Sequence, residues 1–149
     1  MQYSGLLAAA MSALVLVTPG LTAAQSGDAL PAPHARDRLV PASAPSHLSD
    51  WKRKPVWHLL AACDFYFRMH AAQDDFFGGG ADSAGLRRAN EMSDASVSRL
   101  IADRGVSREA ALALHTRAVA YFNHDEDLYG EVEPTVERRC QAGLALTTR

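Results

Sequence analysis

Apolar side chains recur at intervals of three and four over residues 50–149, and this spacing limits the fold more than any other feature of the chain. It is the spacing of α-helices that bury one face. It predicts helices over about 55–75, from 82 or 83 to 104, from 107 to between 123 and 129, and from about 133 onward. No segment alternates apolar and polar residues as a half-buried strand does. The sequence therefore predicts an all-α fold, a small bundle of about four helices.

Local residues mark several of the expected helix ends. Ser107 is a suitable N-cap, and Glu109 follows in the first turn, where the helix dipole favours an acid. Gly105, directly after Arg104, can adopt the left-handed conformation that ends many helices. The first helix is expected to bury a single face, made of Val56, Leu59, Leu60, Cys63, Tyr66, Phe67 and His70.

The N-terminus has the organisation of a secretory signal peptide. An apolar run over 5–17 is followed by a helix-breaking segment at 18–20 and by small residues at 22–24. We therefore expect residues 1–24 to be a signal peptide that is cleaved before Gln25. An uncleaved anchor is the alternative, but the run is shorter than the about 20 apolar residues that a span needs. The expected localisation is periplasmic or secreted, with no membrane span after cleavage.

A proline-rich segment follows the signal. Residues 25–49 contain four of the seven prolines of the chain, mixed with Ala, Ser and His, and show no sustained periodicity. Proline fixes its own φ and pushes the preceding residue toward extended backbone. The sequence predicts a flexible Pro/Ala-rich arm over 25–49 and a helical domain over 50–149.

The chain has two cysteines, Cys63 in the first expected helix and Cys140 in the last. Two cysteines in an exported chain usually pair, and this pair lacks the C-x-x-C spacing of redox catalysts. We therefore expect one disulfide that closes the bundle by joining its first and last helices. Two buried free thiols are the alternative.

The remaining polar residues within the helices match no catalytic motif. The sequence contains no G-x-S-x-G, P-loop, dinucleotide-binding or H-E-x-x-H pattern. His70 and His115 interrupt apolar stripes and are expected to be hydrogen-bonded core side chains, whereas Asp64 and Asp75 are expected to be solvated. The sequence thus predicts no catalytic residue.

His124, Asp125 and Asp127 form the densest set of possible metal ligands, in a register that partly resembles a calcium-binding loop. Counted from Asp125, such a loop needs an oxygen ligand at its fifth position and a bidentate Glu at its twelfth. The chain has Tyr129 and Val136 there. We therefore predict no metal and no cofactor, and keep a metal-binding or hydrolytic protein that uses this turn as the alternative function.

Trp51, Lys52, Arg53 and Lys54 form a small basic and aromatic cluster just before the first helix. Such a cluster can contact an anionic membrane surface or a partner, so these residues are the candidate partner-binding set. The formal net charge of the whole chain is −2. This balance gives no electrostatic basis for nucleic-acid binding, which needs a basic surface.

These features together predict an exported, non-enzymatic helical module that binds another protein or a small ligand in the cell envelope. The basis is the absence of a catalytic motif in the sequence, a small disulfide-closed core and a flexible arm. A structural envelope component held by an uncleaved signal is a further possibility.

Overall fold

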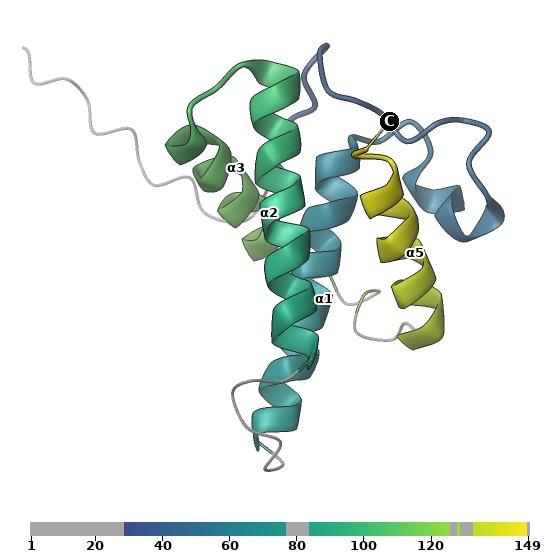
Figure 1. Ribbon diagram of the computed structural model, residues 1–149, viewed down its shortest axis with the longest axis vertical. Coiled ribbons are helices and arrows are strands. Elements are labelled where there is room, and N and C mark those ends of the chain that lie inside the picture. The colour runs from purple at the N-terminus through teal and green to yellow at the C-terminus, as the bar shows by residue number, and fades with distance from the viewer. Residues whose placement is uncertain (1–28, 77–83, 126–127, 129–132, 149) are drawn as a thin grey trace, which may run out of the picture.

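The computed structural model describes residues 29–76, 84–125, 128 and 133–148 of this chain, and these residues form an all-α fold (Figure 1). A short 3-10 helix, η1 (Ser46–Trp51), precedes the packed α-helices α1 (Val56–Phe76), α2 (Ala84–Arg104), α3 (Arg108–Phe122) and α5 (Glu133–Ala145). The predicted class, with four main helices, is confirmed. The predicted signal peptide, residues 1–24, lies outside the described residues.

The ends of α2 and α3 are set by the local residues that the sequence indicates. Ser107 Oγ accepts a hydrogen bond from the Ala110 N–H at 3.2 Å, which caps α3. Gly105 has a φ of +66°, and its N–H donates to the Ile101 carbonyl at 2.9 Å. Both predicted end signals are confirmed, while the expected cap at Asp82 or Ser83 lies outside the described residues.

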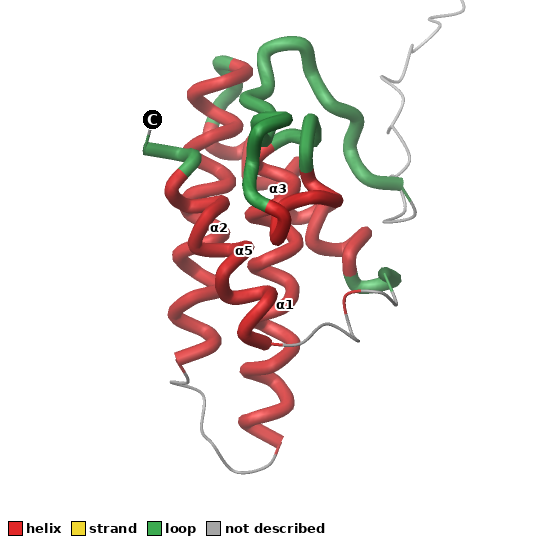
Figure 2. The backbone as a smooth tube through the Cα atoms, turned by 90° about the vertical axis from the view of Figure 1, so that its right-hand side faces the viewer, coloured by secondary structure: helices red, strands yellow, loops and turns green. Residues whose placement is uncertain are grey.

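Helix α1 is the centre of the bundle and is buried on all sides over its first half. Every residue from Val56 to Phe67 is buried, including the full circumference of three turns. The prediction of a single buried face is therefore too narrow. The physical reason is that α2, α3 and α5 all pack on α1 (Figures 1 and 2), so side chains on every side of this stretch are covered, the polar His58 and Asp64 included.

The disulfide joins α1 to α5, as the sequence predicts. The sulfur atoms of Cys63 and Cys140 are bonded, with their Cα atoms 5.7 Å apart. Gly143 lies one turn further along α5, where an added Cβ would lie only 3.1 Å from Leu59 Cδ2. A glycine at this position allows α5 to lie close against α1 beside the disulfide.

Residues 29–49 do not form the loose arm that the sequence predicts. Val40 is 1% exposed and Leu48 2% exposed, so both belong to the core. Leu39 pairs with Pro55 in an isolated antiparallel bridge, and the Val40 N–H donates to the Lys54 carbonyl at 2.9 Å. This segment covers one end of the bundle (Figure 2), because its apolar side chains find partners there that are distant in sequence.

A buried carboxylate fixes this segment to the helices. Asp37 accepts hydrogen bonds from Arg104 Nε at 2.7 Å and from Trp57 Nε1 at 3.1 Å. The guanidinium of Arg104 also lies over the Trp57 ring, 5.1 Å from its centroid. Burial raises the pKa of the Asp37 carboxyl, but the hydrogen bonds from Arg104, the His34 N–H and Trp57 outweigh it and hold the pKa below its usual value.

Candidate functional site

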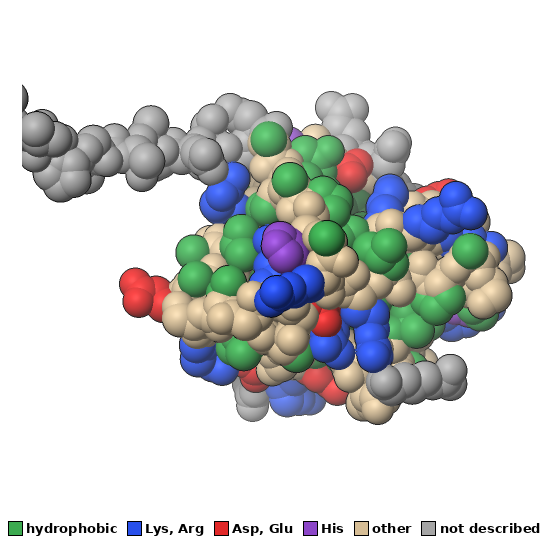
Figure 3. Space-filling model, turned by 90° about the horizontal axis from the view of Figure 1, so that it is seen from above, with side chains coloured by type: hydrophobic (Ala, Val, Ile, Leu, Met, Phe, Trp, Pro, Cys, Tyr) green, Lys and Arg blue, Asp and Glu red, His purple; other side chains and the backbone are tan. Residues whose placement is uncertain are grey.

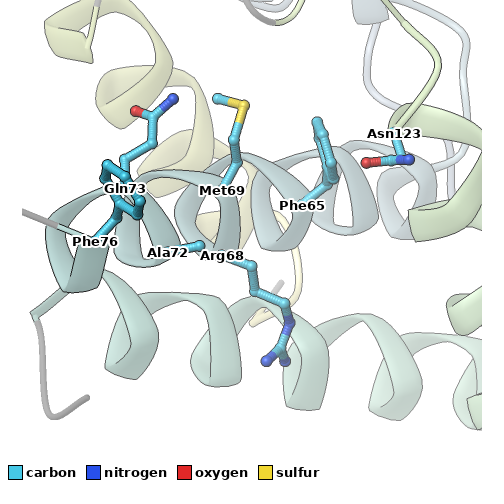
Figure 4. Close-up of a pocket in the computed structure, with 7 residues that line it drawn as sticks. All are labelled: Phe65, Arg68, Met69, Ala72, Gln73, Phe76 and Asn123. Atoms are coloured by element: carbon cyan, nitrogen blue, oxygen red, sulfur yellow. The ribbon is translucent and has the colours of Figure 1, made fainter. Parts of the chain in front are cut away.

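The second half of α1 carries an open apolar groove on its outer side (Figure 4). The groove has a volume of about 500 Å³ and is lined on α1 by Phe65, Arg68, Met69, Ala72, Gln73 and Phe76. Asn123, which directly follows α3, lines the end of the groove next to Phe65. Phe76, at the opposite end, is 86% exposed, the largest exposed fraction among the large apolar side chains that the structure describes.

The groove exists because α1 is longer than the helix that packs beside it. Helix α3 ends at Phe122, and Figure 1 shows α1 and α2 extending beyond that end. The Asn123 side chain lies level with Phe65, so the row of side chains from Phe65 to Phe76 begins where α3 stops. The groove therefore begins on α1 next to the end of α3.

An ion pair holds a cation at the rim of the groove. Arg68 Nε lies 2.6 Å from Asp64 Oδ1, one turn earlier on α1, and Arg68 also donates to Asn90 Oδ1 of α2 at 3.2 Å. The Arg68 side chain is still 41% exposed. Because both contacts are made by its guanidinium, the charge is fixed in place at the rim.

The sequence predictions did not include this groove. They assigned α1 one buried face and did not consider the apolar residues opposite it, which run from the buried Phe65 to the exposed Phe76. Phe65, Met69, Ala72 and Phe76 follow each other at intervals of four, three and four, which is the spacing of a helix-packing seam. This second stripe on α1 was the signal that could have revealed the groove.

A buried polar network connects α1, α2 and α3 next to the groove. His115 of α3 lies 2.8 Å through Nε2 from Asp64 Oδ2, and 3.0 Å through Nδ1 from Ser96 Oγ of α2. The Ser96 hydroxyl in turn donates to the Trp57 carbonyl at 3.1 Å. His115 is the hydrogen-bonded core histidine that the sequence predicts. Asp64, which is 2% exposed, is not solvated as predicted, because His115 and Arg68 compensate its buried charge.

Asp64, His115 and Ser96 are the residue types of a hydrolytic triad, but their arrangement is structural. Each side chain is at most 3% exposed, so a substrate cannot reach the Ser96 hydroxyl. The hydroxyl hydrogen is directed to a backbone carbonyl, and the serine contacts Nδ1 of the histidine where a serine protease uses Nε2. The network therefore ties three helices together.

The predicted alternative metal site gains no support from the described residues. His124 is exposed and Asp125 half-buried just beyond α3, while Asp127 lies outside the described residues. Within the part of the chain that the structure describes, no three His, Cys, Asp or Glu side chains are placed to hold a metal ion.

In the basic and aromatic cluster before α1, Arg53 and Lys54 are exposed and Lys52 is half-buried, but Trp51 is buried. Trp51 is 7% exposed and packs on Phe122, with ring centroids 6.0 Å apart. Lys54 Nζ lies 5.3 Å from the centre of the Trp51 ring, and Arg53 occupies a tight turn with a φ of +64°. Figure 3 shows Lys and Arg side chains at several separate places on the face in view, among hydrophobic ones. Trp51 thus contributes to the core instead of a binding surface.

No protein-family model, curated protein or solved structure matches this chain. Among the described residues, no helix has the length and apolar character needed to cross a membrane.

Proposed function

We propose that this protein is an exported, non-enzymatic helical module that binds a segment of another envelope protein in the groove of α1. The exposed apolar groove that ends at Phe76 is the observation that carries this proposal. Contiguous exposed apolar surface rimmed by polar groups marks interaction sites on soluble domains. Phenylalanine, methionine and arginine are also enriched at protein interfaces, and Met69 can adapt its shape to a partner.

A protein segment suits the groove better than a small ligand does. Small-ligand sites are concave and bury most of the surface of their ligand. This groove instead runs along the outer side of one helix, and the Phe76 side chain at its end is 86% exposed. A long segment that lies on α1 can cover Phe76, whereas a small molecule in the groove leaves it in solvent.

Export rests on the predicted signal over 1–24, and the disulfide is compatible with it, since such bonds persist in oxidising compartments. Intact-mass measurement of the protein made by its source cells tests this part of the proposal. The expected mature chain begins at Gln25. A mass that retains residues 1–24 would support the uncleaved anchor.

Site-specific photo-crosslinking tests the binding function. Benzoylphenylalanine in place of the exposed Gln73, at the rim of the groove, should yield an adduct with a discrete second protein in the source cells. The same group in place of Ala113, which is exposed on α3, should not yield that adduct. Equal adducts from both positions would contradict a binding site in the groove.

The captured protein, once purified, allows a quantitative test. Phe76→Ser should weaken its binding by more than about tenfold, because an aromatic side chain that a partner covers as a hot spot is worth about 2 kcal/mol or more. Leu112→Ser is the matched control, since Leu112 is 49% exposed on α3 and does not line the groove. Both substitutions are at exposed positions and should leave the fold intact. Equal affinities of the two variants would refute the proposal.

A further inference from the structure

We propose that residues 29–37 form a strap that separates from the helices in acid, while the rest of the bundle stays folded, and that His58 is the group that triggers the release. The strap contacts the first turn of α1 and the last turn of α2, at the end of α1 away from the groove. Its release is independent of binding in the groove. Two observations carry the proposal: the polar character of the contacts that hold the strap, and the burial of His58 beside it.

The strap is attached to the helices mainly through polar contacts. Asp37 accepts hydrogen bonds from Arg104 Nη2 at 2.7 Å and from Trp57 Nε1 at 3.1 Å. Arg104 Nη2 also donates to the Ala32 carbonyl at 3.1 Å. Within the strap only Pro31 and Asp37 are buried. A segment with so little apolar burial depends on the charges and hydrogen bonds around it.

The chain directly after the strap is anchored in another way. Val40 and Leu48 belong to the core, and the Arg38 carbonyl accepts a hydrogen bond from the Val56 N–H at 2.8 Å. Apolar burial and backbone pairing do not change when a side chain gains a proton. The strap can therefore separate while the chain from Arg38 onward stays attached.

His58 occupies a site that suits only its neutral form. The side chain is 2% exposed and packs edge-on against the Trp57 ring. The Pro31 carbonyl of the strap accepts a hydrogen bond from it, while Nε2 has no partner among the described residues. An imidazolium here would lose its water without a full set of acceptors, which makes the charged form costly.

The charged groups that face His58 come from three elements. Asp37 of the strap favours a positive charge on the ring, but Arg104 of α2 and Lys54, just before α1, oppose it. Burial is the largest effect, and it lowers the pKa of His58 from 6.5 to about 4. Separation of the strap would open the ring to water, where its pKa returns toward 6.5.

The direction of the switch follows from these two values. Above pH 6.5 His58 is neutral in both forms, so pH has no effect on the strap. Below pH 6.5 the released form binds a proton that the closed form does not, and the ratio of released to closed protein increases as the pH is lowered. Between pH 7.5 and pH 4.5 this ratio should rise by about 70-fold.

Hydrogen exchange followed by NMR tests the release in the whole mature protein. The Trp57 indole N–H reports on the strap, because it donates to Asp37. The backbone N–H of Leu100, which is fully buried in α2, reports on unfolding of the whole bundle. After correction for intrinsic exchange, protection of the Trp57 indole should fall by about 70-fold from pH 7.5 to pH 4.5. At pH 4.5 it should be at least about tenfold below that of Leu100.

Two substitutions assign the effect to His58. In His58→Gln, which carries no titrating group at this position, protection of the Trp57 indole should be the same at both pH values. His124→Gln is the matched control, because His124 is exposed, and it should behave as the wild type does. Circular dichroism at both pH values shows whether each variant is folded.

The other outcomes would overturn the proposal. Equal protection of Trp57 and Leu100 at pH 4.5 would mean that the strap separates only when the whole bundle unfolds. That comparison uses the wild type alone, so it decides the matter even if His58→Gln does not fold. A loss of Trp57 protection that persists in folded His58→Gln would mean that another group titrates.

Discussion

Acidification from pH 6.5 to pH 4 should destabilise this fold through His58. The side chain lies in the first turn of α1, is 2% exposed, and packs edge-on against Trp57 with ring centroids 3.9 Å apart. Its Nε2 has no hydrogen-bond partner among the described residues. Burial lowers the pKa of His58 from 6.5 to about 4, although a hydrogen bond to the Pro31 carbonyl and the Asp37 charge act in the opposite direction.

The sign and size of the effect follow from the two protonation states. Below pH 6.5 the unfolded chain binds a proton at His58 that the folded protein does not bind. The free energy of unfolding therefore decreases as the pH is lowered. The difference between a pKa of 6.5 and one of about 4 corresponds to roughly 3 kcal/mol, with 1.36 kcal/mol for each pH unit. The full stability is present above pH 6.5. The pKa of Asp37 is lowered from 3.8 in the folded protein, so protonation of Asp37 reduces the stability further only below about pH 3.8.

Urea unfolding of the wild type and of His58→Leu, followed by circular dichroism between pH 7.5 and 4.5, measures this effect. Between these limits the stability of the wild type relative to the variant should decrease by roughly 2 to 3 kcal/mol. His124→Leu is the control, because His124 is exposed, and its pH profile should follow that of the wild type. Parallel profiles for the wild type and His58→Leu would refute the reasoning.

Three further tests address the disulfide, the buried polar network and the turn after α2. Replacing Cys63 and Cys140 with Ala should lower the melting temperature in calorimetry, because the disulfide spans 77 residues and its loop closure is worth up to about 4.5 kcal/mol; an unchanged melting temperature would contradict this. Asp64→Leu should cost about 1 to 3 kcal/mol in urea unfolding, since it leaves the buried His115 ring without its hydrogen-bond partner. A His115→Leu substitution added to it should restore part of that loss, and strictly additive costs would argue against the network. Gly105→Ala should cost about 1 kcal/mol, because its φ of +66° strains a residue with a Cβ, and an unchanged denaturation midpoint would show that the turn relaxes.

Local signals were enough to predict the helices and two of their ends. The Ser107 cap and the Gly105 stop depend on side chains and backbone within one turn, so they can be predicted from the local sequence. The disulfide was also predictable, because two cysteines on apolar helix faces allow a single pairing. The all-α class followed from the three and four spacing, since each amphipathic helix needs another helix to cover its apolar face.

The docking of residues 29–49 was not predictable from local signals. Asp37 is 67 residues from Arg104 and 20 residues from Trp57, and these two side chains come within hydrogen-bond distance of it only in the packed bundle. From its proline-rich composition alone this segment is expected to be a loose chain, because the sequence does not show the core residues on which it packs. Asp64 was misjudged for the same reason, since its partner His115 is 51 residues away.

The groove depends on the packed arrangement in another way. The sequence contains the apolar stripe from Phe65 to Phe76, but the exposure at its Phe76 end follows from α3 ending at Phe122 while α1 continues beyond it. The spacing of apolar residues along one helix predicts which side chains share a face. Whether that face is covered or open depends on where the neighbouring helices start, stop and pack, and those positions are fixed by contacts between residues that are far apart in the chain.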